Sequence, residues 1–446
     1  MKWLKRILFA LGVMLALALV LPIFISFNDY IPQVESELST KLKEPVSIKN
    51  IKFTALPTPH VTFDGIKCGT TDDIRLAKVV VTPDILSLFQ SSIVIKNIEV
   101  DSLILTQRAI GKLSELSKTG VTPPLQPPTR LRLEAIHFIN AQLILGKMNF
   151  GPFEASVHLG GNSKLVEASI ATLDGKLKAV VKPDQSNYLI DASAKKWIWP
   201  IGPHVLFDEV NIKGIATFED IKLNKIDANL YGGTANGQIN LRWHKGFKLN
   251  GNFDIKQVEM RQIASMLSSK THVSGKLNAK PVFSASATSL EQMKQNLHLE
   301  TSFKIQNGVL YGVDIQKVVT NLIKKGSTGG ETRFDQFSGH LDMMQGAYHL
   351  TQLKIVSGTL AAEGNVNISR KKDISGRINA QVKVAGISTN VPLNVAGTID
   401  SPMLYPTGAT IAGAAVGTAI MGPGVGTSVG AKVGDWVDNM FSRKKK

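Results

Sequence analysis

Cysteine is nearly absent from this chain, which has one, Cys68, in 446 residues. A single thiol excludes an intrachain disulfide framework and a cysteine-rich zinc site, and we expect it to be buried. The nine histidines are scattered without a His-Glu-x-x-His pair, and no Gly-x-Ser-x-Gly nucleophile elbow occurs. The sequence therefore predicts no catalytic residue, no metal site, no cofactor and no enzymatic activity.

Amphipathic helices are also scarce. Helical periodicity is limited to short stretches at residues 32–43, 83–90, 258–268, 290–297 and 313–325. We expect these helices to cap or flank a sheet, because together they are too small to cover one built from most of the chain.

Short strands with one apolar face make up most of the sequence. In residues 377–387, the apolar Ile378, Ala380, Val382 and Val384 alternate with polar residues, which is the period of a half-buried β-strand. The same alternation recurs at residues 238–243 and 365–368 and around Phe303. The predicted fold class is mainly β, with an elongated, curled, largely antiparallel sheet whose apolar face forms a groove.

The apolar positions of these strands are the candidate groove lining. An open groove would bind apolar ligand, whereas a closed sandwich would bury the same faces against each other. If Val382 and Val384 face an open groove, aspartate at both positions should leave the fold intact. The candidate residues are Ile239, Leu241, Phe303, Ile305, Val366, Ile368, Ile378, Val382 and Val384.

A repeated hairpin pattern runs through these strands. Residues 230–241 parallel residues 355–368, and residues 171–178 form a weaker copy. Each copy is a strand, a glycine-containing turn and a second strand. Repeated hairpins of this kind stack into a sheet that grows along one axis.

The N-terminus carries an apolar segment. Residues 7–27 contain 21 residues without a charge, which as a helix would span roughly 32 Å, close to the ~30 Å core of a bilayer. Lys2, Lys5 and Arg6 precede it and acidic residues follow, so the positive-inside rule predicts a single-pass inner-membrane anchor with the bulk of the chain in the periplasm. A cleaved signal peptide is the alternative.

Seven basic residues at the two ends supply part of the net charge of +16 and leave +9 for the rest of the chain. A mildly basic surface on an exported chain fits anionic lipid headgroups and not nucleic acid.

The C-terminal tail changes to a glycine- and alanine-rich composition. Gly422 and Gly424 flank Pro423 and predict a helical hairpin, with a flexible tail and a second membrane span as alternatives. The second arm is amphipathic with a basic end, which suits an anionic membrane surface. The predicted membrane-contacting residues are Val433, Trp436, Val437, Met440, Phe441, Arg443 and Lys444.

Several segments resemble the AsmA family of envelope proteins. They are residues 46–53, Leu56-Pro57, residues 61–66 and, most specifically, residues 307–406 with the runs 307–318, 332–339, 391–393 and 395–402. The Gly-rich tail after Pro406 departs from the family pattern. The expected segments are an anchor at 1–28, an AsmA-like β segment at 29–125, a groove region at 126–406 whose AsmA-like C-terminal part spans about 300–406, and the tail at 407–446.

The resemblance implies an inner-membrane protein that faces the periplasm and takes part in outer-membrane biogenesis, carrying phospholipid along a β-groove. The implied partners are phospholipid, the inner membrane, and an outer-membrane or periplasmic protein. The alternative is a scaffold or assembly factor for outer-membrane proteins that has a closed β core and carries no lipid.

Overall fold

The computed structural model describes residues 27–408, except 72, 91, 107, 110–130, 146–147, 200–203, 267, 322–328 and 385–386. Most of the predicted anchor and tail, and the boundary expected near residue 125, lie outside these residues. Within the described part, the structure contains no helix with the length and apolarity needed to cross a membrane. The described chain is mainly β with a few short helices, as the sequence predicted.

Each predicted helical stretch contains a helix. Helix α2 has the expected length, whereas the helices in 83–90, 258–268 and 290–297 are shorter than expected. Residues 83–90 form only a 3-10 turn, because strand β4 extends through Pro83. The helices are η2 (Phe27–Tyr30), α2 (Ile31–Leu42), η3 (Leu86–Phe89), α4 (Met260–Ser265), α5 (Leu290–Gln295) and α6 (Ile315–Asn321).

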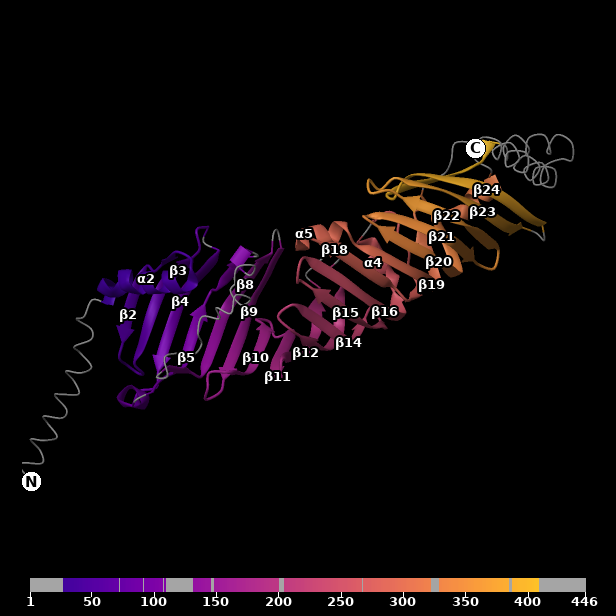
Figure 1. Cartoon of the computed structure of the whole chain (residues 1–446). Helices are drawn as coiled ribbons and strands as arrows, with labels where there is room; N and C mark the ends of the chain where they lie inside the picture. The colour runs from indigo at the N-terminus through magenta and orange to yellow at the C-terminus, as the bar shows by residue number, and fades with distance from the viewer. Residues whose placement is uncertain are drawn as a thin grey trace, which may run out of the picture. The chain divides into compact units, whose positions relative to one another are not determined.

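The chain forms two compact units. The first contains the residues up to Ala194 together with Ile215–Phe218, and the second contains the remainder. The strands of the first unit are β1 (Val46–Ser47), β2 (Asn50–Thr54), β3 (His60–Cys68), β4 (Ile74–Pro83), β5 (Ile93–Asp101), β6 (Ile104–Thr106), β7 (Leu131–Leu133), β8 (Ala135–Leu145), β9 (Met148–Leu159), β10 (Leu165–Thr172), β11 (Leu177–Asp184) and most of β12 (Asn187–Ile198) (Figure 1).

Pairing in the first unit is antiparallel between sequential strands except at one junction. There β5 pairs in parallel with β7 and β8, and β6 pairs in parallel with β8. The alternation of apolar residues predicted strands but could not distinguish this parallel junction from another hairpin.

One face of the first unit carries an apolar row that crosses β2 to β12 in register. Helix α2 packs over the start of the row, in a cluster that includes the buried Cys68. Further along, Val100 and Ala192 are buried, most of the other side chains are partly covered, and Ile170 is 42% exposed. The row runs through Ile51, Phe63, Val79, Val100, Phe138, Ala155, Ile170, Ala179 and Ala192.

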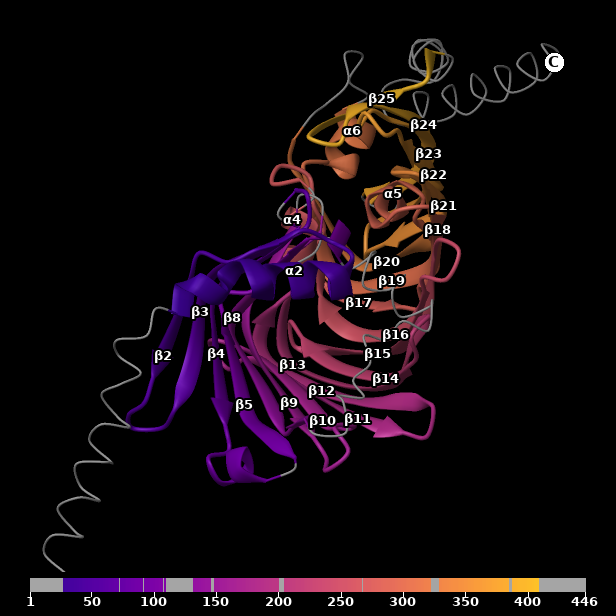
Figure 2. The same cartoon turned by 60° about the vertical axis from the view of Figure 1, so that its left-hand side comes forward.

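In its described residues, the second unit is built from consecutive antiparallel strands with three short helices. Figure 2 shows the later strands curving, with α6 inside the curve. The strands are β13 (Leu206–Ala216), β14 (Asp220–Leu230), β15 (Gly233–Arg242), β16 (Phe247–Glu259), β17 (Lys276–Ala279), β18 (Val282–Ala287), β19 (His298–Tyr311), β20 (Glu331–Met344), β21 (Ala347–Val356), β22 (Leu360–Ile368), β23 (Ile374–Val384), β24 (Ile387–Thr398) and β25 (Ser401–Pro406).

Bulges interrupt the ladders of the second unit. An extra residue lies between Ile255 and Val258 of β16 and between Leu350 and Leu353 of β21. At these points Gln257 and Gln352 adopt positive φ angles of 56° and 51°. A bulge bends its strand and increases the local twist, so these residues contribute to the curvature of the sheet.

The predicted hairpins are confirmed. Residues 230–241, 355–368 and 171–178 form the turns of β14–β15, β21–β22 and β10–β11. The repeat places Gly237 and Gly364 at equivalent positions. A Cβ at Gly237 would lie 2.2 Å from the Asn252 carbonyl oxygen, and one at Gly364 would lie 2.2 Å from that of Arg377. Both glycines therefore permit close approach of the next strand.

The packed core of the second unit lies under α6. Ile315, Val318 and Val319 of this helix join a cluster with Val382 of β23 and Val391 of β24, in which Val318 and Val391 are fully buried. The Asp314 carboxylate caps the helix by accepting a 2.8 Å hydrogen bond from the Lys317 amide. One end of the curved sheet is thus closed by a helix.

Candidate apolar binding site

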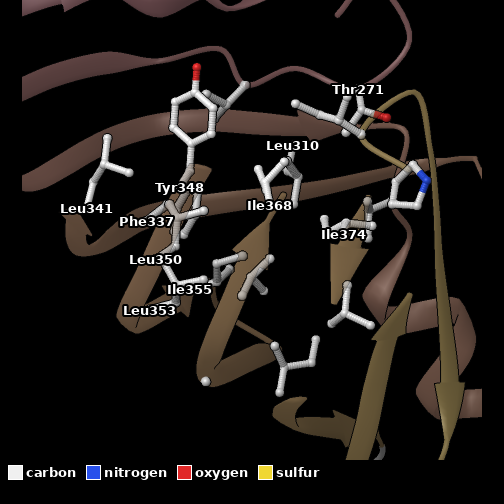
Figure 3. A pocket seen from close by; sticks show the side chains of 18 of the residues that line it. Thr271, Leu310, Phe337, Leu341, Tyr348, Leu350, Leu353, Ile355, Ile368 and Ile374 are labelled. Atoms are coloured by element: carbon white, nitrogen blue, oxygen red, sulfur yellow. The ribbon is translucent and has the colours of Figure 1, made fainter. Parts of the chain in front are cut away.

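Next to this core the second unit contains a cavity of about 520 Å³. Its floor is formed by β20 to β25, and Figure 3 shows apolar side chains converging on it. The residues that line it from the strands include Phe337, Leu341, Tyr348, Leu350, Leu353, Ile355, Ala362, Val366, Ile368, Ile374, Ile378, Val395 and Leu404.

The floor is apolar because two rows of alternating residues are aligned across the strands. One row runs from Leu341 through Leu350, Val366, Gly376 and Val395 to Leu404. The other joins Phe337, Ile355 and Ala362 and continues into the core as Ala380 and Val391. Apolar side chains that lie next to one another on the same face of neighbouring antiparallel strands form a continuous apolar surface.

Residues 271–273 border the cavity from the segment that follows α4. Val273 forms an isolated antiparallel bridge with Leu310, and the His272 ring stacks on Tyr311 at 4.7 Å between centroids. The Arg261 guanidinium lies 5.3 Å from the Tyr311 ring centroid and donates to its hydroxyl. The Thr271 hydroxyl oxygen and His272 Nδ1 are buried and have no hydrogen-bond partner among the residues that the structure describes.

The β22–β23 turn forms a polar rim. Ser369, Arg370 and Lys372 of this turn line the cavity. The Ser369 hydroxyl donates to the Asp373 carboxylate (3.1 Å) and accepts from the Lys371 amide (3.2 Å), which fixes the turn.

The rim carries more cationic than anionic charge where it meets the cavity. Arg370 donates to the neutral Gln345 side chain, and among the described residues neither Arg370 nor Lys372 has a carboxylate within salt-bridge distance. Asp373 of the same turn and Asp400 of the β24–β25 turn do not line the cavity, and Glu363 of β22 is its one lining carboxylate among the described residues. A cationic edge thus adjoins an apolar interior.

The structure brings three of the sequence-predicted lining residues, Val366, Ile368 and Ile378, into the cavity. Ile305 and Phe303 belong to the adjoining packed cluster. The pairings of β15, β16, β18 and β19 place Ile239 on the same face of the sheet as Phe303, and both Ile239 and Leu241 are half-buried outside the cavity.

Val382 does not line the cavity. It is 1% exposed and packs in the cluster that contains α6. We therefore expect aspartate at position 382 to destabilise the fold, contrary to the sequence-based expectation. Strand alternation alone does not show that the helix predicted at 313–325 covers this side chain. The side chain of Val384 and residues 433–444 lie outside the described part.

Several lining residues were not predicted from the sequence. Phe337 and Leu341 on β20, and Tyr348 and Leu350 on β21, follow the same alternation and could have been found by extending it to every strand. His272 has no such signal, because it lies between regular elements and reaches the cavity only through tertiary folding. No group of three or more histidine, cysteine, aspartate or glutamate side chains able to hold a metal occurs among the residues with described positions.

Comparison with known families gives one match. Residues 204–353 match the model of the AsmA family. This chain carries an AsmA-family region. The matched region runs from just before β13 into β21 and thus includes the first two strands of the cavity floor, which confirms the family resemblance inferred from the sequence. Neither a curated protein nor a solved structure matches the chain.

Proposed function

We propose that this AsmA-like protein is a non-catalytic lipid carrier of the cell envelope and that the cavity holds acyl chains of phospholipid. The observation that carries this proposal is an apolar cavity with Arg370 and Lys372 at its rim. An acyl chain needs an apolar surface along its length, and the headgroup needs polar or charged groups at the mouth of the cavity.

The size of the cavity fits this ligand. Its volume of about 520 Å³ lies within the range of roughly 300–1,000 Å³ for small-molecule sites. Removing about ten methylenes from water contributes about 8 kcal/mol at ~0.8 kcal/mol each. The half-buried apolar row of the first unit offers further surface of the same kind.

The rim fits a phosphate headgroup. The Arg370 guanidinium can form paired hydrogen bonds with phosphate oxygens, and Lys372 adds a second cation. The alternative function, a scaffold or assembly factor for outer-membrane proteins, would require only a closed core such as the one under α6. The cavity beside that core favours lipid binding over the scaffold function.

The proposed location is based on the family match and on the predicted anchor. We place the chain in the inner membrane as a single-pass protein, with its bulk in the periplasm, where it takes part in outer-membrane biogenesis. Its partners would be phospholipid, the inner membrane, and an outer-membrane or periplasmic protein. The AsmA-family match and the uncharged residues 7–27 support this placement.

Photocross-linking in intact cells tests the proposal. A benzophenone amino acid at Leu350 faces the cavity, whereas the same residue at Lys354 on the same strand is exposed. We expect cross-links to phosphate-labelled lipid from position 350 and not from position 354. Equal yields at both positions, or no lipid adduct at position 350, would contradict lipid binding in this cavity.

A further inference from the structure

We propose that one side of the first unit's sheet, the edge formed by the strand ends and loops that include η3, contacts the surface of a lipid bilayer. The side chains of Leu86 and Phe89 enter the bilayer interface. This contact is separate from the cavity of the second unit and from the predicted membrane-binding tail.

The contact would be made by η3, which displays large apolar side chains to solvent. Leu86 is 73% exposed and Phe89 is 87% exposed, and Ile85 and Leu88 are also exposed. Folded soluble proteins rarely expose several large apolar side chains in one turn without a binding partner. We call residues 85–89 the apolar knob.

The apolar knob is held by its own hydrogen bonds. Ser87 is 1% exposed, and its hydroxyl donates to the Asp84 carbonyl (2.7 Å) and accepts from the Val94 amide (2.9 Å). The Ser87 amide also bonds to the Asp84 carbonyl oxygen at 3.1 Å. Because Ser87 faces inward, the residues on either side of it point outward, and their exposure follows from the way the turn is built.

Strand register places a second exposed leucine at the same edge. Thr54 pairs with His60 at the end of the β2–β3 hairpin, and Thr82 pairs with Asn97 beside the apolar knob. Val61 and Val81 pair across β3 and β4, so both loops leave the sheet on one side. Leu56, in the β2–β3 loop, is 62% exposed.

The apolar N-terminal stretch identifies a bilayer as the occupant. Residues 7–27 carry no charge, and this stretch ends at Phe27. The Phe27 ring lies 5.7 Å from the ring of Phe53, the residue before the last one of β2. The chain therefore enters the first unit next to the strand whose following loop carries Leu56. A membrane that holds residues 7–27 lies within reach of this edge.

The charge pattern agrees with a bilayer interface. The sequence has no charged residue from Ile85 to Ile95, with Asp84 and Lys96 on either side. Leucine and phenylalanine can enter the headgroup boundary without taking a charge with them. A protein-binding surface would more often include charged or hydrogen-bonding groups at its rim.

The test uses the full chain reconstituted in vesicles of phosphatidylethanolamine and phosphatidylglycerol. An environment-sensitive fluorophore is attached at Phe89→Cys in a Cys68→Ala background. The matched control is Leu173→Cys, since Leu173 is 48% exposed and follows the end of β10 at the opposite edge of the sheet. Both sites are exposed, so neither label should disturb the fold, and thermal unfolding followed by circular dichroism verifies this.

We expect a blue shift of the emission at position 89 and loss of that emission when the vesicles contain a lipid-borne quencher, with no change at position 173. If the label at position 89 keeps the emission of a water-exposed fluorophore, as at position 173, the proposal is overturned and the result points to a protein partner. Equal quenching at both positions would also overturn it, because the edge would then have no preference for the bilayer.

Discussion

The backbone amide of Gln352 donates a 2.9 Å hydrogen bond to Oδ1 of Asn365 on the next strand. Gln352 is the extra residue of the β21 bulge, and the bulge removes its amide from the regular ladder. The backbone amide of the β16 bulge residue is hydrogen-bonded in the same way, since the Gln257 amide donates to Oδ1 of Asn278 at 3.2 Å. An asparagine on the following strand thus satisfies the backbone group that each bulge releases.

Asn365→Ala should lower the free energy of unfolding by about 0.5–1.5 kcal/mol, the usual net contribution of one hydrogen bond. Urea denaturation measures this loss. Asn379→Ala is the matched control, because Asn379 is exposed on the same face of the neighbouring strand. Equal losses in both variants would show that the asparagine does not support the bulge.

Val382→Asp should destabilise the second unit by about 3 kcal/mol or more, because it buries a charge without a partner under α6. Ile368→Asp should preserve most of the stability and reduce lipid cross-linking, because Ile368 is half-buried in the cavity wall. Thermal unfolding and cross-linking yield are measured side by side. Similar stability of both variants would contradict the division into packed core and open cavity.

Gly364→Ala should destabilise the fold by about 1–3 kcal/mol, since the added methyl group would overlap the Arg377 carbonyl oxygen and force β23 away. Gly358→Ala should have little effect, because its Cβ would meet no heavy atom within 4 Å. Both changes replace glycine by alanine in the same hairpin. Their stability difference, measured by denaturation, therefore reports the close approach of the strands.

The Thr172 hydroxyl hydrogen bond, followed by those from Lys176, lowers the pKa of Asp174 from its ordinary 3.8 to about 2. A carboxyl group with a lowered pKa stabilises the folded state above pH 3.8 and loses that contribution as the pH falls towards 2. Thr172→Val should raise the Asp174 pKa towards 3.8 in an NMR titration. An unchanged pKa would show that the threonine hydroxyl is not its main cause.

Replacing both rim cations, Arg370→Gln with Lys372→Gln, should weaken binding of anionic phospholipid to the reconstituted chain. The matched control removes two positive charges that do not line the cavity, Lys354→Gln with Lys371→Gln. Partition of fluorescent phosphatidylglycerol between chain and vesicle measures both. Equal weakening would assign the effect to overall charge and remove the rim from headgroup binding.

The sequence reveals local structure well where local residues decide it. Alternation identifies β15, β22 and β23, and glycine turns identify the hairpins at residues 230–241 and 355–368, because both depend on near neighbours. Packing against distant elements is different. The cover that α6 places over Val382, and the position of His272 at the cavity, arise from contacts between segments far apart in the chain, which a strand pattern does not encode.

The parallel junction of the first unit also sets an order of events during folding. Nearly every other strand can pair with its sequence neighbour as soon as a short turn closes, and such local pairings form quickly. β5 also pairs with its neighbour β4, but its other side must wait for β8, whose residue Ile136 pairs with Ile98. Closing this long loop carries an entropic cost before any contact compensates for it. We expect it to be the slow step of refolding, during which β5 remains an open edge for other chains to pair with.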